Sequence, residues 1–277
     1  MEVSEKVIKD NVALALKEDV GTEDITASLL DEGASSKATL ISREDAVLCG
    51  KAWFDESFRQ LDTDIKIDWK VEDGDTIHVN QKLCVLTGCT RALLTGERTA
   101  INFLQTLSGT ATMVSEYVRQ IRGTGARLLD TRKTLPGLRL AQKYAVTCGG
   151  GMNHRVGLYD GFLIKENHIL ANGSITNAIQ QAKKRDLPVE VEVENLKELE
   201  EALEADPDRI LLDNFSIDEL FRAVEMAQGR TSLEASGNIT LKNLRNVAKT
   251  GVDYISIGAL TKHVTAVDFS LRFEPLS

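Results

Sequence analysis

Cationic side chains gather in the middle of this sequence, in types and spacings that suit the binding of anions. Arg132 and Lys133 are neighbours, and His154 and Arg155 form a second pair shortly after a run of three glycines at 149–151. Arginine presents a planar fork that binds carboxylate or phosphate oxygens two at a time, and lysine supplies a compact charge that suits phosphate. The alternative is two solvated surface pairs, but three glycines allow backbone to approach a ligand closely, which favours a site.

Further polar residues stand where strand-like runs end. Lys165 follows GFLI, Glu194 ends VEVEVE, and Asp213 ends RILLD. The two carboxylates could accept hydrogen bonds from sugar hydroxyls or hold a divalent cation that bridges phosphates. Glu190 shares a strand face with Glu194 by the period of two, and we interpret Glu190 as part of a solvated face rather than of the site.

Two small-residue loops follow the last strand-like runs. Ser236-Gly237-Asn238 comes after TSLEA, and Gly258-Ala259 ends YISIGA. In α/β barrels, backbone N–H groups of such loops often hold a phosphate. The sequence therefore predicts a phosphate-binding segment at the ends of the last two strands.

The elements that must position these residues alternate between strand and helix patterns. Helix-like segments separate six strand-like runs, which are residues 126–130, 161–165, 189–194, 209–213, 231–235 and 254–258. Such alternation predicts parallel strands with crossover helices, and active sites of α/β barrels lie at the carboxyl ends of the strands. No G-x-G-x-x-G follows the first strand, so a dinucleotide site is not expected.

The first part of the chain has a different pattern. Helical spacing of apolar residues predicts helices over 4–18, 52–61 and 91–108, and short strands are predicted over 37–44, 46–50, 65–71, 76–79 and 82–88. We expect an α/β protein with an N-terminal α/β sandwich domain (1–108) and an α/β barrel domain (109–269). The tail, 270–277, carries another strand pattern and is expected to return to the first domain.

Composition excludes several classes of protein. The net charge is −9 and aromatic residues make up 5% of the 277 residues, which argues against nucleic acid as a partner. The four cysteines form no C-x-x-C pair or zinc-like cluster. The charged N-terminus and the lack of a long apolar run predict no signal peptide and no membrane span, so a cytoplasmic location is expected.

Long motifs give the sequence a family resemblance. The segments ERTAINFLQTLSGTAT, DTRKTLPGLR, GGGMNHRVGLYDGFLIKENHI, VEVEVENL, LLDNF, LEASGNI and YISIGALT resemble the quinolinate phosphoribosyltransferases, also called nicotinate-nucleotide pyrophosphorylases (carboxylating). One departure is Glu23 in EDVGTEDIT, where the family usually has a second glycine. The resemblance implies an N-terminal sandwich joined to an incomplete barrel of about seven strands.

The resemblance also implies residue roles. Arg98 resembles an arginine that reaches into the partner's site, and Arg132, His154 and Arg155 resemble the clamp for a dicarboxylate. Lys133 and Lys165 resemble pyrophosphate and substrate contacts near the reacting centre. Glu194 and Asp213 resemble carboxylates near the ribose and the metal, and these four residues are the catalytic candidates. The expected 5′-phosphate cradle is Ser236, Gly237, Asn238, Gly258 and Ala259, and the substrate-binding set also includes Thr134 and Ile257.

The implied reaction joins quinolinate to phosphoribosyl pyrophosphate (PRPP), with Mg²⁺, and gives nicotinate mononucleotide, pyrophosphate and CO2 in NAD biosynthesis. The implied assembly is a homodimer with a shared site, and some members are hexamers. One alternative is a related phosphoribosyltransferase that acts on nicotinate, or a molybdenum-transport-associated relative. A second, from another class, is a biotinyl or lipoyl carrier, because residues 69–88 resemble the hammerhead of those domains, although no M-K-M or D-K-A tripeptide is present.

Overall fold

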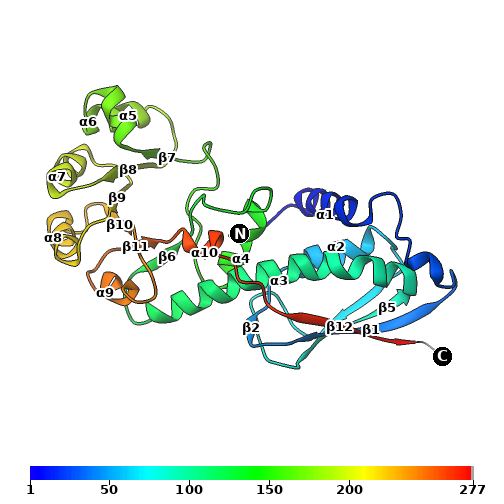
Figure 1. Cartoon of the computed structure of the whole chain (residues 1–277). Helices are drawn as coiled ribbons and strands as arrows, with labels where there is room; N and C mark the ends of the chain where they lie inside the picture. The colour runs from blue at the N-terminus through cyan, green and yellow to red at the C-terminus, as the bar shows by residue number, and fades with distance from the viewer. Residues whose placement is uncertain (276–277) are drawn as a thin grey trace. The chain divides into compact units, whose positions relative to one another are not determined.

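The computed structural model describes residues 1–275 and divides into two compact units (Figure 1). The first unit comprises residues 1–115, 135–150 and 263–277, and the second comprises residues 116–134 and 151–262. Residues 276 and 277, the end of the predicted returning tail, lie outside the described residues. Each unit has its own sheet.

The first unit is built on a four-stranded antiparallel sheet in the order β12-β1-β5-β3, with a small β2-β4 pair beside it. The last strand therefore pairs with the first, Leu271 opposite Leu40. The elements are α1 (Glu5–Val20), the 3-10 helix η1 (Ala27–Leu29), β1 (Ser35–Ser42), β2 (Ala46–Val47), α2 (Lys51–Arg59), β3 (Lys66–Trp69), β4 (Thr76–Ile77), β5 (Lys82–Cys89), α3 (Thr90–Gln120), α4 (Arg139–Cys148) and β12 (Phe269–Pro275).

Apolar residues of helical period fill the space between this sheet and its helices. Phe54 and Phe58 of α2 and Leu104 of α3 are fully buried with Leu86 of β5. Burial of such side chains stabilises each by about 1.5–3 kcal/mol. Trp53 lies in a second cluster that includes Ala141 and Ala145 of α4, so α4 joins the first unit although the sequence analysis placed it within the barrel range.

Helix α3 is longer than predicted. The pattern suggested an end at residue 108, but α3 continues for 31 residues to Gln120. Gly109 does not end the helix; a Cβ there would lie 2.1 Å from the backbone oxygen of Thr265. This glycine therefore serves a close approach of backbone rather than a helix terminus.

The second unit carries a parallel sheet in the order β6-β11-β10-β9-β8-β7. An isolated parallel bridge joins Met152 to Leu129 of β6. The described sheet thus has six strands and this bridge, where about seven strands were expected. Its elements are β6 (Arg127–Leu129), β7 (Phe162–Ile164), α5 (Glu166–Asn172), α6 (Ile175–Ala182), β8 (Val189–Val193), α7 (Leu196–Ala205), β9 (Arg209–Asp213), α8 (Ile217–Ala227), β10 (Ser232–Ser236), α9 (Leu244–Ala248), β11 (Tyr254–Ser256) and α10 (Ala259–Lys262).

Helices α6, α7 and α8 follow one another along one side of these strands (Figure 1). They cover Val191, Val193, Ile210 and Leu212, which are buried. The residues that alternate with these along the strands, such as Glu190 and Arg209, point to the other, concave face of the sheet. This face carries the polar residues. The α/β class is confirmed, and no helix of the described residues is long and apolar enough to cross a bilayer.

Candidate active site

Strand register places the polar residues of the second unit on one face of the parallel sheet. Glu190 pairs with Arg209, and Asp213 pairs with Ser236. Paired residues of parallel strands project to the same side. Extending the β8–β9 register by two residues beyond Glu192–Leu211 places Glu194 beside Asp213. The two predicted carboxylates are therefore neighbours at the carboxyl end of the sheet.

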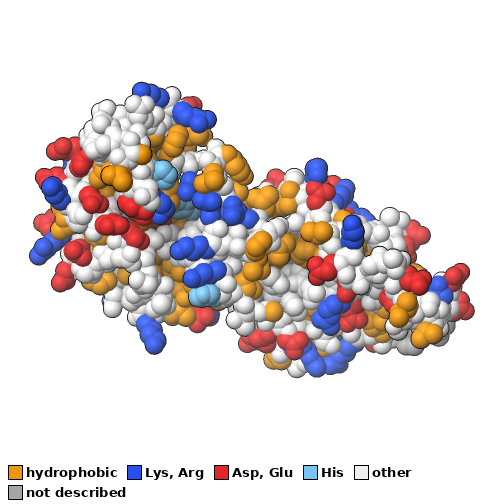
Figure 2. Space-filling model, turned by 45° about the horizontal axis from the view of Figure 1, so that its top comes forward, with side chains coloured by type: hydrophobic (Ala, Val, Ile, Leu, Met, Phe, Trp, Pro, Cys, Tyr) orange, Lys and Arg blue, Asp and Glu red, His pale blue; other side chains and the backbone are white. Residues whose placement is uncertain are grey.

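Arg132 and Arg155 come close enough to influence each other. Burial and then the charge of Arg132 lower the pKa of Arg155. The Nη1 atom of Arg155 donates to the carbonyl of Gly161, at 3.2 Å. The charges of Glu190 and Asp160 oppose the lowering of this pKa. An anion bound near both guanidinium groups would add to their stabilisation. Lys and Arg side chains gather around histidine side chains on the face shown in Figure 2.

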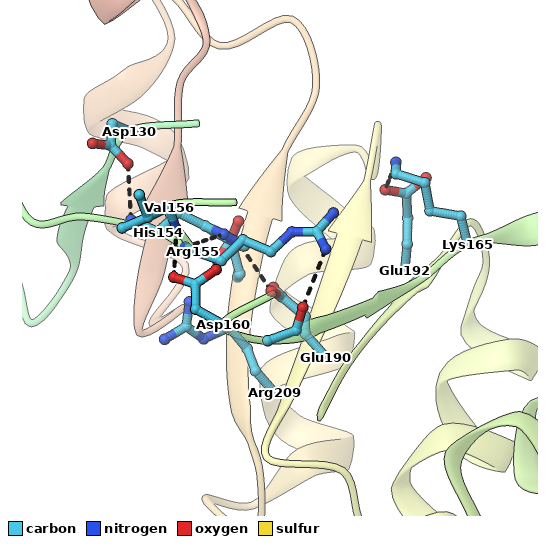
Figure 3. Close-up of polar contacts among 11 residues, drawn as sticks. Asp130, His154, Arg155, Val156, Asp160, Lys165, Glu190, Glu192 and Arg209 are labelled. Atoms are coloured by element: carbon cyan, nitrogen blue, oxygen red, sulfur yellow. Dashed lines mark hydrogen bonds and ion pairs between the residues drawn. The ribbon is translucent and has the colours of Figure 1, made fainter. Parts of the chain in front are cut away.

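His154 is held on several sides. Its backbone N–H donates to Oδ1 of Asp130 at 2.9 Å, and its Nε2 lies 2.8 Å from Oε2 of Glu190. Its Nδ1 accepts from the backbone N–H of Arg155 at 2.7 Å (Figure 3). Burial opposes protonation, but the hydrogen bond to Glu190 and the charges of Glu190 and Glu234 outweigh it and raise the pKa of His154.

Lys165 stands at the end of β7 and forms an ion pair with Glu192 of β8 (Figure 3). Its side chain keeps 42% of its surface exposed, so the ammonium group is accessible to a ligand. Glu194 is also exposed and lines a cavity of about 490 Å³ together with Glu192 and Glu198. Its backbone N–H donates to Oε2 of Glu198, at 2.9 Å.

The loop after β10 is bound to the loop after β9. The backbone N–H of Asn214 donates to the carbonyl of Ser236 at 2.9 Å, and Nδ2 of Asn238 donates to Oδ1 of Asn214 at 3.1 Å. Gly237 has φ of +94°, and a Cβ there would lie 2.2 Å from Oδ1 of Asn214. Only glycine suits this position. Nδ2 of Asn214 also donates to Oδ2 of Asp213, at 2.7 Å.

Lys133 lies against the loop after β11. A Cβ on Gly258 would be 2.8 Å from Cδ of Lys133, and the hydroxyl of Thr261 donates to the carbonyl of Lys133 at 2.8 Å. The backbone N–H of Thr134 donates to the carbonyl of Arg132 at 3.0 Å, and that of Ile257 donates to the carbonyl of Leu129 at 3.1 Å. Ala259 begins the short helix α10.

Arg98 belongs to the first unit, whereas the other predicted site residues belong to the second. It is exposed on α3 and lines a cavity of about 280 Å³ with Glu23 and Asp24. The departure at Glu23 lies in a loop to which the sequence analysis assigned no site residue. The structure instead places Glu23 beside a predicted site residue.

Several polar residues of this region were not predicted. They share deep burial or a direct contact with a predicted residue, and they are Asp130, Glu190, Glu192, Arg209, Asn214 and Glu234. The interpretation of Glu190 as solvated is wrong, because it is 6% exposed and faces His154. The sequence did contain a signal for Glu190 and Glu192, because these residues alternate with valines in β8 and therefore share one face with the predicted site residue Glu194.

A parallel α/β sheet that brings arginine, lysine and carboxylate side chains together on one face is typical of an α/β enzyme. Residues 24–108 match the family described as quinolinate phosphoribosyl transferase, N-terminal domain, and residues 110–272 match its C-terminal domain. The chain therefore belongs to the quinolinate phosphoribosyl transferase family.

Relatives agree with this assignment over nearly the whole chain. A probable nicotinate-nucleotide pyrophosphorylase [carboxylating] of Bacillus subtilis is 41% identical over 92% of this chain and 89% of its own. The nicotinate-nucleotide pyrophosphorylase [carboxylating] of Mycobacterium leprae is 40% identical over 95% of this chain and 96% of its own. The solved structure of the Francisella tularensis nicotinate-nucleotide pyrophosphorylase superposes with a TM-score of 0.96 at 48% identity, covering 99% of this chain and 98% of that one.

Proposed function

We propose that this chain transfers the phosphoribosyl group of PRPP to quinolinate with decarboxylation, which is the nicotinate-nucleotide pyrophosphorylase (carboxylating) reaction of NAD biosynthesis. The observation that carries the proposal is the proximity of Arg132 and Arg155, with His154 next to them. Two guanidinium groups match two carboxylates of one small ring. A monocarboxylate such as nicotinate would neutralise only one.

The chemistry follows from where charge develops. The bond from ribose C1 to pyrophosphate breaks, and the pyridine nitrogen bonds to C1. We assign Lys133 and Lys165 to the departing pyrophosphate and Glu194 and Asp213 to the ribose, whose ring becomes positive in the transition state. The bond between the ring carbon and its carboxylate then breaks, its electron pair stays on the ring carbon, where the pyridinium charge stabilises it, and CO2 leaves. This carbon takes up a proton from solvent to give nicotinate mononucleotide. No protein nucleophile is required.

Mg²⁺ fits this assignment. Glu194 and Asp213 offer hard oxygen ligands at neighbouring strand ends, and Mg²⁺ is commonly held by one or two carboxylates together with substrate phosphates. When bound, the ion would neutralise pyrophosphate charge. The 5′-phosphate is assigned to Ser236, Gly237, Asn238, Ile257, Gly258 and Ala259, with Thr134 beside the pyrophosphate.

Assembly and domain limits are part of the proposal. Arg98 is exposed on the first unit, which suits a homodimer in which Arg98 completes the partner's site; a hexamer would be built from such dimers. We keep the division into residues 1–108 with the tail, and 109–269, as a division by family domain, because the two family matches end at 108 and begin at 110. The compact units of the structure differ from it, since residues 109–115 and 135–150 belong to the first unit.

Turnover of the purified protein tests the proposal. Quinolinate, PRPP and Mg²⁺ should give nicotinate mononucleotide and CO2 in equal amounts, and nicotinate should be a poor substrate. Omission of PRPP is the control. Turnover of nicotinate without CO2 release, in the absence of turnover of quinolinate, would contradict the substrate assignment.

A further inference from the structure

A group of four charged side chains, of which Arg209 alone is partly exposed (26%), lies on the concave face of the parallel sheet, nearer the amino ends of the strands than Lys165 and Asp213. It consists of His154, Glu190 of β8, Arg209 of β9 and Glu234 of β10. The carboxylate side chains are 8% and 0% exposed, and the imidazole is 9% exposed. These four residues are called the interior ion group, of which Figure 3 labels His154, Glu190 and Arg209.

The members are connected by a continuous chain of contacts. Nη1 of Arg209 donates to Oε2 of Glu234 at 2.9 Å, and this oxygen lies 3.6 Å from Nε2 of His154. The same Nε2 lies 2.8 Å from Oε2 of Glu190. Arg209 is itself fixed by stacking on Tyr254, at 4.0 Å from the ring centre. The imidazole is therefore oriented by two carboxylates, each on a different strand.

The chain of contacts ends on the backbone of Arg155. The backbone N–H of Arg155 donates to Nδ1 of His154, and the backbone N–H of His154 donates to Asp130. Both nitrogens of the ring are thus engaged within the protein. A shift of the imidazole would move the backbone that carries the Arg155 guanidinium.

The interior ion group costs stability. Oε1 of Glu190 and Oε1 of Glu234 are buried without a hydrogen-bond partner among the described residues. Buried, unsatisfied carboxylate oxygens are destabilising, and apolar residues would pack this face more favourably. Charged residues that destabilise the fold at a buried position indicate a functional role for their charges.

We propose that Glu190, Glu234 and Arg209 are positioning residues for Arg155, and that they act through the imidazole of His154. The inference rests on the proposed function, in which Arg155 binds a carboxylate of quinolinate. Glu190 reaches the quinolinate clamp through His154, whose ring accepts from the backbone N–H of Arg155, whereas Glu234 also hydrogen-bonds Ser256, next to Ile257 of the loop after β11. We therefore expect Glu190 to affect the affinity for quinolinate more than that for PRPP.

Steady-state kinetics of Glu190 variants test the inference. Glu190→Ala removes the acceptor for Nε2 and should raise KM for quinolinate about tenfold or more, while KM for PRPP stays within about twofold. Glu190→Gln keeps an acceptor oxygen at the same reach and should recover most of the loss. Thr231→Val is the matched control, because Thr231 is buried directly before β10 and its hydroxyl has no hydrogen-bond partner among the described residues. Both KM values should be unchanged.

Several outcomes would overturn the inference. Equal increases in both KM values, or failure of Glu190→Gln to recover, would indicate a general structural role. Should Glu190→Ala not fold, Glu190→Gln and Glu234→Gln remain, and unchanged quinolinate KM in both would refute the inference. A stoichiometric divalent metal in the purified wild type that is lost in Glu234→Gln would replace positioning by metal binding, since His154, Glu190 and Glu234 could together hold an ion. Absence of wild-type turnover with quinolinate and PRPP would instead refute the proposed function.

Discussion

Glu234 makes the stability of this protein depend on pH in a direction that can be derived from its surroundings. Its side chain is fully buried. Burial, and then the negative charge of Glu190, raise the pKa of Glu234 from 4.5 to about 7, against the opposing effects of His154, Ser256 and Arg209. Near neutral pH the folded protein therefore retains a proton that the unfolded chain has lost.

The sign of the effect follows from linkage. Below about pH 4.5 the Glu234 carboxyl is protonated in both states, so its contribution to the free energy of unfolding is fully present. As the pH rises through about 7, the folded state must ionise this buried group and the contribution is lost. A pKa difference of about 2.5 corresponds to about 3 kcal/mol. Glu234→Gln replaces the carboxyl by an uncharged group of the same size and removes this dependence.

Urea unfolding followed by circular dichroism measures the effect. Between about pH 5.5 and about pH 8.5, the free energy of unfolding of Glu234→Gln relative to wild type should rise by about 2 kcal/mol. Glu225→Gln, which removes an exposed carboxylate from α8, controls for the loss of one negative charge. A Glu234→Gln difference that is the same at both pH values would refute the argument, because it would mean that Glu234 has the same pKa in the folded and unfolded states.

Three further predictions concern the site. Arg155→Ala removes a charge-assisted contact and should weaken transition-state binding by about 2–4 kcal/mol, which lowers kcat/KM for quinolinate about thirtyfold to nearly a thousandfold. Values of kcat/KM near wild type in initial-rate assays would contradict the assignment of Arg155 to the carboxylate clamp. Gly237→Ala places a Cβ against Asn214 at positive φ and should lower Tm and raise KM for PRPP at least about fivefold; an unchanged KM would remove this loop from the phosphate site. Arg98→Ala and Lys165→Ala, each inactive alone, should regain part of the activity when mixed, because one site of the mixed dimer is intact; no recovery would count against a shared site.

Most elements of the fold could be predicted because their periods are regular. The strand-like runs at 189–194 and 209–213 became β8 and β9, and the amphipathic helix predicted over 4–18 became α1. Helix α3 was predicted too short because the expected helix ended before Gly109, and glycine is less favourable in a helix interior than other residues except proline. The glycine is required there by a close tertiary contact with Thr265, and a local sequence pattern carries no information about such a contact.

The strand-end residues were also predictable, whereas the interior ion group was not. Alternation of glutamate and valine in β8 is typical of a strand with one solvated face. The sheet, however, curves so that Glu190 meets His154 from another segment. Glu234, in TSLEA, is buried for the same reason, since it also faces His154. The burial of these carboxylates depends on how β8, β9 and β10 pair and on which segment covers them. The sequence pattern alone does not specify this pairing.

The spacing along β8 and its neighbours supports the assignment of the subsites. Glu190, in the interior ion group, and Glu194, at the strand end, are four residues apart, or ~13 Å at ~3.3 Å per residue. His154, whose ring accepts a hydrogen bond from the backbone of Arg155, lies beside Glu190. Asp213 and Ser236 lie at the strand ends, at the position of Glu194. A pyridine ring, a ribose and a 5′-phosphate in sequence extend over a comparable length. The aromatic dicarboxylate would therefore lie deepest, against the arginines, and the phosphate would lie at the loops, with the reacting C1 between them near Lys165. A substrate without the second carboxylate would fill the same length but lack one of the two carboxylate contacts with these arginines. Discrimination between quinolinate and nicotinate should therefore reside in Arg132 and Arg155 rather than in the loops.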